Sequence, residues 1–195
     1  MPKYPYLGDG DHNIKTAYFE VEYEAVFHLK NLYKLAFEWT ELWNYGSIDG
    51  NGEIESLYME RVLSSGSQEQ HIWWRFEKKI NEYVKYFIKF DFQTLNMGKI
   101  EVMHKGKKEK TNKGDIIMRA EAFVMLDWKD EWKSHWLLKH LDEWYVKRWY
   151  KSQIEAHKKQ LWFEMYNLED TIKQYLTLHT PFERPASFHP DKGLA

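Results

Sequence analysis

Histidine is the residue of this chain with the most obvious potential for chemistry. Nine histidines are present, and two of them one helical turn apart could bind zinc, as in the H-E-x-x-H motif. His135 and His140 are five residues apart, where that motif requires four, and the next closest pair, His179 and His189, is ten apart. We therefore predict no metal site.

Two polar residues interrupt the apolar faces of predicted strands. Glu60 shares its face with Tyr58 and Val62, and His104 lies on the apolar face of a later strand. Buried polar groups usually have a hydrogen-bond partner, so these two side chains could point into a ligand cavity. They could equally lie at strand ends in water, which is the simpler interpretation. Acid–base catalysis would require two such groups to converge.

No signature of a common enzyme class is present. The chain contains no cysteine, which excludes disulfides, thiolate metal sites and cysteine nucleophiles. Its glycines are scattered through turns and form no phosphate-binding loop, dinucleotide fingerprint or nucleophile elbow. We therefore name no catalytic residue and no cofactor, and favour a protein that is not an enzyme.

Lysines are concentrated in the segment GKKEKTNKG and just before it. A basic loop at a hairpin tip could contact phosphate, and an exposed Trp73 or Phe87 could stack on bases. Lysine-rich tips also protect sheet edges, so nucleic acid is an alternative partner and not the favoured one. The candidate contacts are Lys105, Lys107, Lys108, Lys110 and Lys113.

Composition shows a surplus of aromatic side chains and an uneven distribution of charge. Aromatics make up 17% of the 195 residues, which fits a heavy core or an interacting surface. The net charge is −2, but residues 1–60 hold 11 acidic against 4 basic side chains, and the remainder holds 19 against 24. Opposed charges of this kind favour contact between acidic and basic surfaces, within one molecule or between neighbours.

The beginning of the chain and its hydropathy indicate a location. The segment MPKYPYLGDGDHN lacks the cationic start and apolar run of a signal peptide. No apolar stretch approaches the roughly 20 residues of a membrane helix. We expect a cytoplasmic protein with no membrane partner.

Periodicity predicts an α+β fold. Residues 16–27 alternate apolar and acidic, which is typical of a half-buried strand, and the segment that begins at residue 28 has the apolar stripe of a short amphipathic helix. Five further strands joined by polar turns complete an antiparallel meander of about six strands. We place them at residues 53–62, 71–80, 82–95, 99–105 and 115–128, with a tight turn at Asn96–Met97–Gly98.

Residues 129–179 read as a long helical region. A single straight helix of that length would span about 75 Å, much more than a compact domain of this size. We therefore expect at least two segments, with the last near 153–178. A single domain would cover residues 1–180, and the Pro-rich residues 181–195 would form an irregular tail.

The order of these elements resembles the helix-grip (START/SRPBCC-like) architecture, in which a curved antiparallel sheet wraps a long terminal helix. That resemblance covers residues 16–178 and implies an apolar cavity between sheet and helix. Separately, IWWRFEKK, IEVMHKGKKEKTNKGDI and LEDTIKQYL resemble stretches of uncharacterised archaeal proteins. This second resemblance implies no activity and no site.

Strand periodicity puts Trp73 on a different face from its neighbour Trp74. The face of Trp73 contains further apolar residues, which could be covered by the same chain, by another subunit or by a ligand. We favour a non-enzymatic protein-interaction or self-assembly module that forms a homo-oligomer. Its candidate interface residues are Trp73, Phe87, Phe123, Phe182 and Phe188.

The alternative to an interaction module is a small-molecule binder with a helix-grip-like cavity. Its candidate wall would lie on the other face of the predicted sheet. The wall residues are Trp74, Tyr86, Phe90, His104 and Val124.

Overall fold

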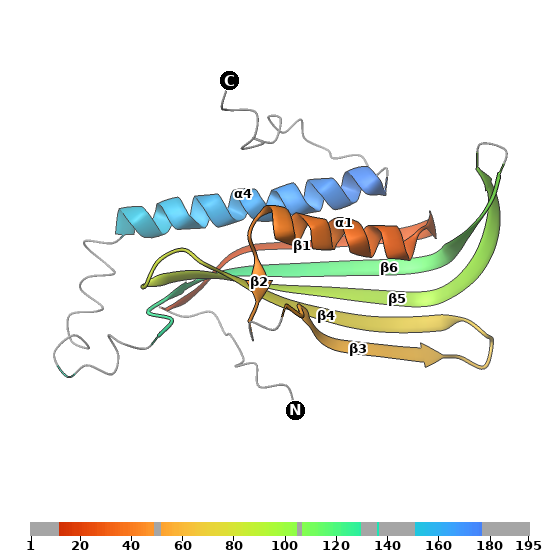
Figure 1. Ribbon diagram of the computed structural model, residues 1–195, viewed down its shortest axis with the longest axis horizontal. Coiled ribbons are helices and arrows are strands. Elements are labelled where there is room, and N and C mark those ends of the chain that lie inside the picture. The colour runs from red at the N-terminus through yellow and green to blue at the C-terminus, as the bar shows by residue number, and fades with distance from the viewer. Residues whose placement is uncertain (1–11, 49–51, 105–106, 130–135, 137–150, 177–195) are drawn as a thin grey trace, which may run out of the picture.

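The structure, a computed structural model, describes residues 12–48, 52–104, 107–129, 136 and 151–176. In this part of the chain the fold is α+β, as predicted, with an open antiparallel sheet of six strands and two helices against one face (Figure 1). The strands are β1 (Asn13–Phe27), β2 (Gly46–Ser47), β3 (Glu55–Val62), β4 (Gln68–Lys79), β5 (Val84–His104) and β6 (Lys107–Leu126), and the helices are α1 (Leu29–Leu42) and α4 (Lys151–Tyr175).

One edge of the described sheet is β1, and the other is formed by β3 together with the two-residue strand β2. The strands pair in the order β1–β6–β5–β4, and β3 and β2 both pair with the far side of β4. β3 pairs with residues 68–74 of β4, and the two-residue strand β2 pairs with residues 76 and 77. Consecutive strands from β3 to β6 are therefore neighbours in the sheet, and β1 completes the other side by pairing with β6.

Alternation along each strand separates an inner face, which the helices cover, from an outer face. In β1, Ala17, Phe19 and Val21 are buried, whereas Tyr18 and Glu20 are exposed. A period of two is the direct consequence of the pleat. The inner faces of β1, β4, β5 and β6 thus contribute to one core.

The helices cover the inner face because each has one apolar stripe. In α1, Leu32, Ala36 and Trp39 are buried at spacings of four and three. His28 caps this helix, because its Nδ1 accepts a hydrogen bond from the Asn31 amide at 3.4 Å. In α4 the same spacing buries Leu161, Met165, Leu168 and Ile172.

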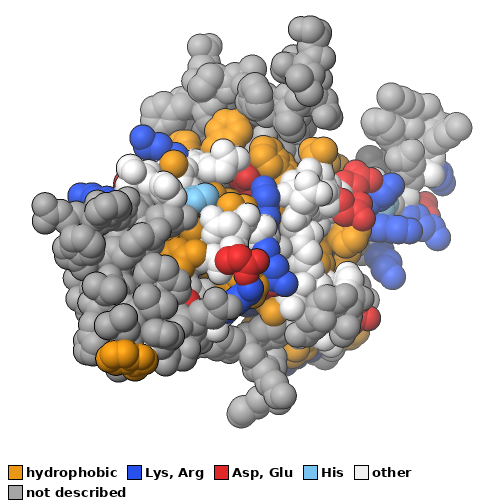
Figure 2. All heavy atoms as spheres, turned by 60° about the vertical axis from the view of Figure 1, so that its left-hand side comes forward, with side chains coloured by type: hydrophobic (Ala, Val, Ile, Leu, Met, Phe, Trp, Pro, Cys, Tyr) orange, Lys and Arg blue, Asp and Glu red, His pale blue; other side chains and the backbone are white. Residues whose placement is uncertain are grey.

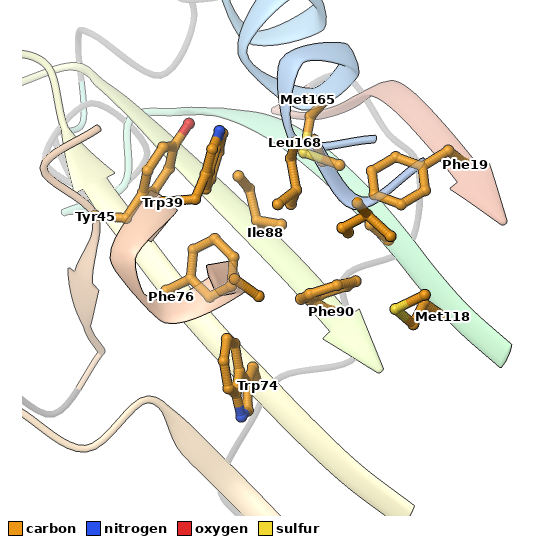
Figure 3. Close-up of a cluster of buried hydrophobic side chains, with 14 of the residues drawn as sticks. Phe19, Trp39, Tyr45, Trp74, Phe76, Ile88, Phe90, Met118, Met165 and Leu168 are labelled. Carbon is orange, nitrogen blue, oxygen red and sulfur yellow. The ribbon is translucent and has the colours of Figure 1, made fainter. Parts of the chain in front are cut away.

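The core consists largely of aromatic rings and long aliphatic side chains. Figure 3 shows Trp39 of α1 and Met165 and Leu168 of α4 pointing toward the inner face of the sheet. There the ring centroids of Trp74 and Phe90 are 6.0 Å apart with their planes at 77°, an edge-to-face arrangement that aromatic pairs favour. Much of the aromatic surplus of the sequence is therefore in the core.

The predicted turn at residues 96–98 is wrong, because β5 is one continuous strand from Val84 to His104. Asn96 and Met97 form a β-bulge opposite Gly114, between the pairs Leu95–Asp115 and Gly98–Lys113. A Cβ at Gly114 would lie 2.9 Å from the carbonyl oxygen of Leu95 and from the Cα of Met97. Glycine is therefore required opposite the bulge.

The lysine-rich segment is also organised differently from the prediction. From Lys107 onward it belongs to β6, so it forms one arm of a hairpin with β5 and not a loop. This hairpin extends past the helices and curves toward their side of the sheet (Figure 1). α4 overlaps the expected last helical segment near residues 153–178, and residues 130–135 and 137–150 before it lie outside the described residues.

Candidate interaction surface

Charged side chains on the outer face of the sheet pair across the strands. Arg119 of β6 lies 2.8 Å from Glu20 of β1, and Arg75 of β4 lies 2.6 Å from Asp91 of β5. Hydrogen bonds from Tyr18 and Arg119 lower the pKa of the Glu20 carboxyl. An exposed pair such as Arg119–Glu20 contributes little to stability. The main effect of these pairs here is to neutralise charge over the centre of the outer face.

Two of the predicted interface residues, Phe87 and Phe123, are buried within the chain. They lie opposite each other on β5 and β6, with exposed fractions of 5% and 2%. Ile48 and Met125 pack against them in a small second core on the outer face. Neither ring therefore presents surface to a partner.

Ion pairs also neutralise the end of the sheet where β4 turns into β5. Figure 2 looks onto this end and shows acidic and basic side chains side by side near the middle of the view. Glu77 is 2.8 Å from Lys85 and 3.7 Å from Lys79. The ring of Trp128 lies 5.1 to 5.3 Å from the ammonium groups of Lys79, Lys85 and Lys129, as in cation–π contacts.

Trp73 is the described interface candidate that remains at the surface, with 38% of its area exposed. It lies on the outer face of β4, directly opposite Leu57 of β3. The guanidinium of Arg75 is 5.7 Å from the centroid of its ring, and Ser56 Oγ donates a hydrogen bond to the Trp73 carbonyl at 3.0 Å. The ring is thus held beside the edge strand.

Strand β3 adds further exposed apolar side chains at this edge of the sheet, on both of its faces. Tyr58 and Val62 are 52% and 63% exposed on one face of β3, and Met59 is 48% exposed on the other. We refer to Tyr58, Met59, Val62 and Trp73 as the edge patch. Glu60 is exposed between these residues and accepts a hydrogen bond from the Tyr58 hydroxyl at 3.0 Å. Glu60 is therefore at the surface and does not point into a cavity.

The candidate cavity residues belong to the packed core. Trp74, Tyr86, Phe90 and Val124 lie on the inner face and are 0 to 1% exposed. The ring of Trp74 contacts Tyr33 of α1, with centroids 4.6 Å apart. The Tyr86 hydroxyl is 3.0 Å from Nδ1 of His157 on α4. The side chain of His104 is outside the described residues.

The remaining candidates are described only in part. Lys108, Lys110 and Lys113 are exposed on β6. Lys108 and Lys110 lie opposite Met103 and Glu101 of β5. Lys105, the side chain of Lys107, Phe182 and Phe188 lie outside the described residues. The structure thus brings Trp73 together with β3 and places the lysines on a separate hairpin.

A buried polar cluster at the contact between the sheet and α4 was not anticipated. Glu164 of α4 is 1% exposed. Its Oε2 accepts a hydrogen bond from the Tyr45 hydroxyl at 2.6 Å, and its Oε1 accepts from Lys78 and Gln160, each at 2.9 Å. Periodicity could have indicated part of this cluster, because Lys78 continues the inward row that includes Trp74.

The chemistry of this cluster is that of a satisfied structural site. The Lys78 ammonium also lies 5.3 Å and 5.8 Å from the rings of Tyr45 and Trp43. Burial, followed by the charge of Glu164, raises the pKa of the Tyr45 hydroxyl well above its usual value. Tyr45 is therefore protonated at neutral pH and serves as a hydrogen-bond donor, not as a base. We assign the cluster to stability.

The described residues provide neither a metal site nor a membrane-spanning helix, and comparison with known proteins finds no relative. Among the described residues, no group of three His, Asp or Glu side chains could hold a metal ion. The two described helices are too short or too polar to cross a membrane. No family model matches the chain, and no curated protein is significantly similar to it.

Proposed function

We propose that this protein is a non-enzymatic interaction module that assembles with other copies of itself through the edge patch. The observation that carries the proposal is a set of exposed apolar side chains on both faces of β3, at a sheet edge that no other described strand pairs with. Tyr58, Met59 and Val62 are exposed on β3, and Trp73 is exposed on the neighbouring strand. Exposed apolar patches and exposed strand edges both favour association, and tryptophan and tyrosine are enriched at interfaces.

The distribution of charge supports assembly as a second contribution. Glu22 and Glu24 are exposed on the outer face of β1, whereas Lys108, Lys110 and Lys113 are exposed on the arm of the hairpin. Contact between an acidic edge of one copy and a basic hairpin of another would add attraction that salt weakens. We expect salt to change the strength of assembly and not to abolish it, because the edge patch is apolar.

We also propose a helix-grip-like architecture with a helical region in two segments. The pairing of β1 with the last strand, and the position of α4 on the inner face, support a helix-grip-like arrangement. The length of residues 129–179 supports a helical region in two segments, because one straight helix of that length would span about 75 Å. In this arrangement the buried core between the sheet and the helices stabilises the domain, and the edge patch forms the contact.

Light scattering across a concentration series, at low and high salt, tests self-assembly directly. We expect a mass that rises above the 23.8 kDa of one chain as concentration increases. The variant Trp73→Ser should shift the transition to higher concentration, because it removes an aromatic anchor. Trp162→Ser is the matched control, since Trp162 is a 46% exposed tryptophan on α4, away from the edge. A mass of one chain under all conditions would contradict the proposal.

A further inference from the structure

We infer that the partner at the edge patch is a second copy of this chain whose β3 adds antiparallel to the first, so that one sheet continues across the dimer. This inference rests on the proposed function and names its partner and geometry. β3 has eight residues, and within the part of the chain that the structure describes it pairs with β4 alone. In an antiparallel ladder, the backbone groups of alternate residues point away from the neighbouring strand. An edge strand therefore offers a row of donors and acceptors to another strand.

Charge distinguishes β3 from the other edge. β1 carries Glu20, Glu22 and Glu24 at alternate positions of its outer face, so two copies of β1 would bring rows of carboxylates together. The charged side chains of β3, Glu60 and Arg61 among them, include both signs. Of the two described edges, β3 is thus the one that can pair with itself without such repulsion.

Repulsion between like charges also limits how the two β3 strands can be aligned. In a symmetric antiparallel pair that continues the sheet, residues that face each other lie on the same face of the sheet. The two-fold axis therefore passes between the two copies of one residue, which we describe as the residue on the axis. The regular part of β3 is Leu57–Val62, because a bulge separates Glu55 from Leu57 in its pairing with β4. With Glu60 or Arg61 on the axis, identical charges would face each other at the shortest cross-strand distance, which is destabilising.

A register with Met59 on the axis avoids facing like charges and uses most of the regular part of β3. With Met59 on the axis, Tyr58 lies opposite Glu60 of the second copy, and Leu57 lies opposite Arg61 of the second copy, so no like charges meet. With Tyr58 on the axis, only the three residues Leu57–Met59 could pair regularly, because the bulge lies directly before Leu57. Trp73 lies one strand behind the seam, on β4, as the cross-strand neighbour of Leu57.

Disulfide trapping tests this register. The chain has no cysteine, so Met59→Cys introduces a single thiol. Residues that face each other across an antiparallel pair have Cα atoms about 4.5 to 5.5 Å apart, within the range of a disulfide. Val62→Cys is the matched control, because Val62 is exposed on the same strand. In this register the two copies of Val62 would be about 20 Å apart.

We expect the Met59→Cys protein to form a covalent dimer under mild oxidation at least tenfold faster than the Val62→Cys protein. Equal rates, or faster linkage at Val62, would overturn the register and the inference. If neither variant links while the unmodified protein scatters as an oligomer, assembly uses another surface and the proposed function survives without this edge. If the unmodified protein is a monomer at every concentration, both proposals fail, and a different partner must occupy the edge.

Discussion

Lys78 and Glu164 form an ion pair of 2.9 Å that joins β4 to α4 across 86 residues of sequence. The carboxylate is 1% exposed, and it has three donors, Lys78, Tyr45 and Gln160. A buried charge is tolerated only when it is paired and hydrogen-bonded. This contact therefore stabilises the position of α4 on the sheet, together with the buried apolar residues of α4.

We predict that Lys78→Met destabilises the protein, because it leaves the Glu164 carboxylate buried without its cation. Removal of one partner from such a pair costs about 3 kcal/mol, and two donors to Glu164 remain. Urea unfolding followed by circular dichroism measures the change in the free energy of unfolding. Lys34→Met is the control, because the Lys34–Glu38 pair on α1 is exposed and should contribute less than about 0.5 kcal/mol. Equal effects of the two variants would contradict a structural role for Lys78.

Stability should fall at alkaline pH, and Tyr45 should account for part of the fall. Burial and Glu164 raise the pKa of Tyr45 above its value in the unfolded chain, so the folded state holds the phenolic proton more tightly. The resulting stability is complete below about pH 10 and is lost as pH rises further. Tyr45→Phe should cost about 1 to 3 kcal/mol at neutral pH and make the alkaline slope shallower. An unchanged slope in Tyr45→Phe would contradict this assignment.

His157 should make the protein less stable in mild acid. Burial lowers the pKa of His157, so the unfolded chain binds a proton that the folded chain does not. Stability is then complete above about pH 6.5 and declines as pH falls below it. We expect His157→Gln to flatten this decline in urea unfolding between about pH 6.5 and 5. The control is His71→Gln, on the outer face of the sheet. The two variants should give different pH profiles, and identical profiles would exclude His157 as the cause.

Gly114→Ala should be the most damaging glycine substitution in the sheet. The added methyl group would lie 2.9 Å from backbone atoms of Leu95 and Met97, and backbone cannot move aside as a side chain can. We expect a loss of about 1 to 3 kcal/mol. Gly46→Ala is the matched control, because nothing lies within 4 Å of its added Cβ. Thermal melts of both variants measure the difference, and a Tm for Gly114→Ala equal to that of Gly46→Ala would contradict the requirement for glycine.

Local periodicity alone determined most of the elements of this fold. The alternation in β1 and the three-and-four spacings in α1 and α4 identify their buried faces, because the pleat and the helical turn impose those periods wherever one side meets a core. The α+β class followed from the order of these patterns. The same alternation predicts that Trp73 and Trp74 lie on opposite faces, and in the structure Trp73 is exposed and Trp74 is buried.

Tertiary structure decided the features that depend on residues far apart in sequence. Residues 96–98 have the composition of a turn, and only the pairing of β5 with β6 makes them a bulge. Phe87 and Phe123 alternate outward as predicted, yet contact with Ile48 helps to bury them. The Lys78–Glu164 pair depends on where α4 crosses the sheet. Strand and helix periods specify which way a side chain faces, whereas its partners follow from packing between elements, which no local pattern encodes.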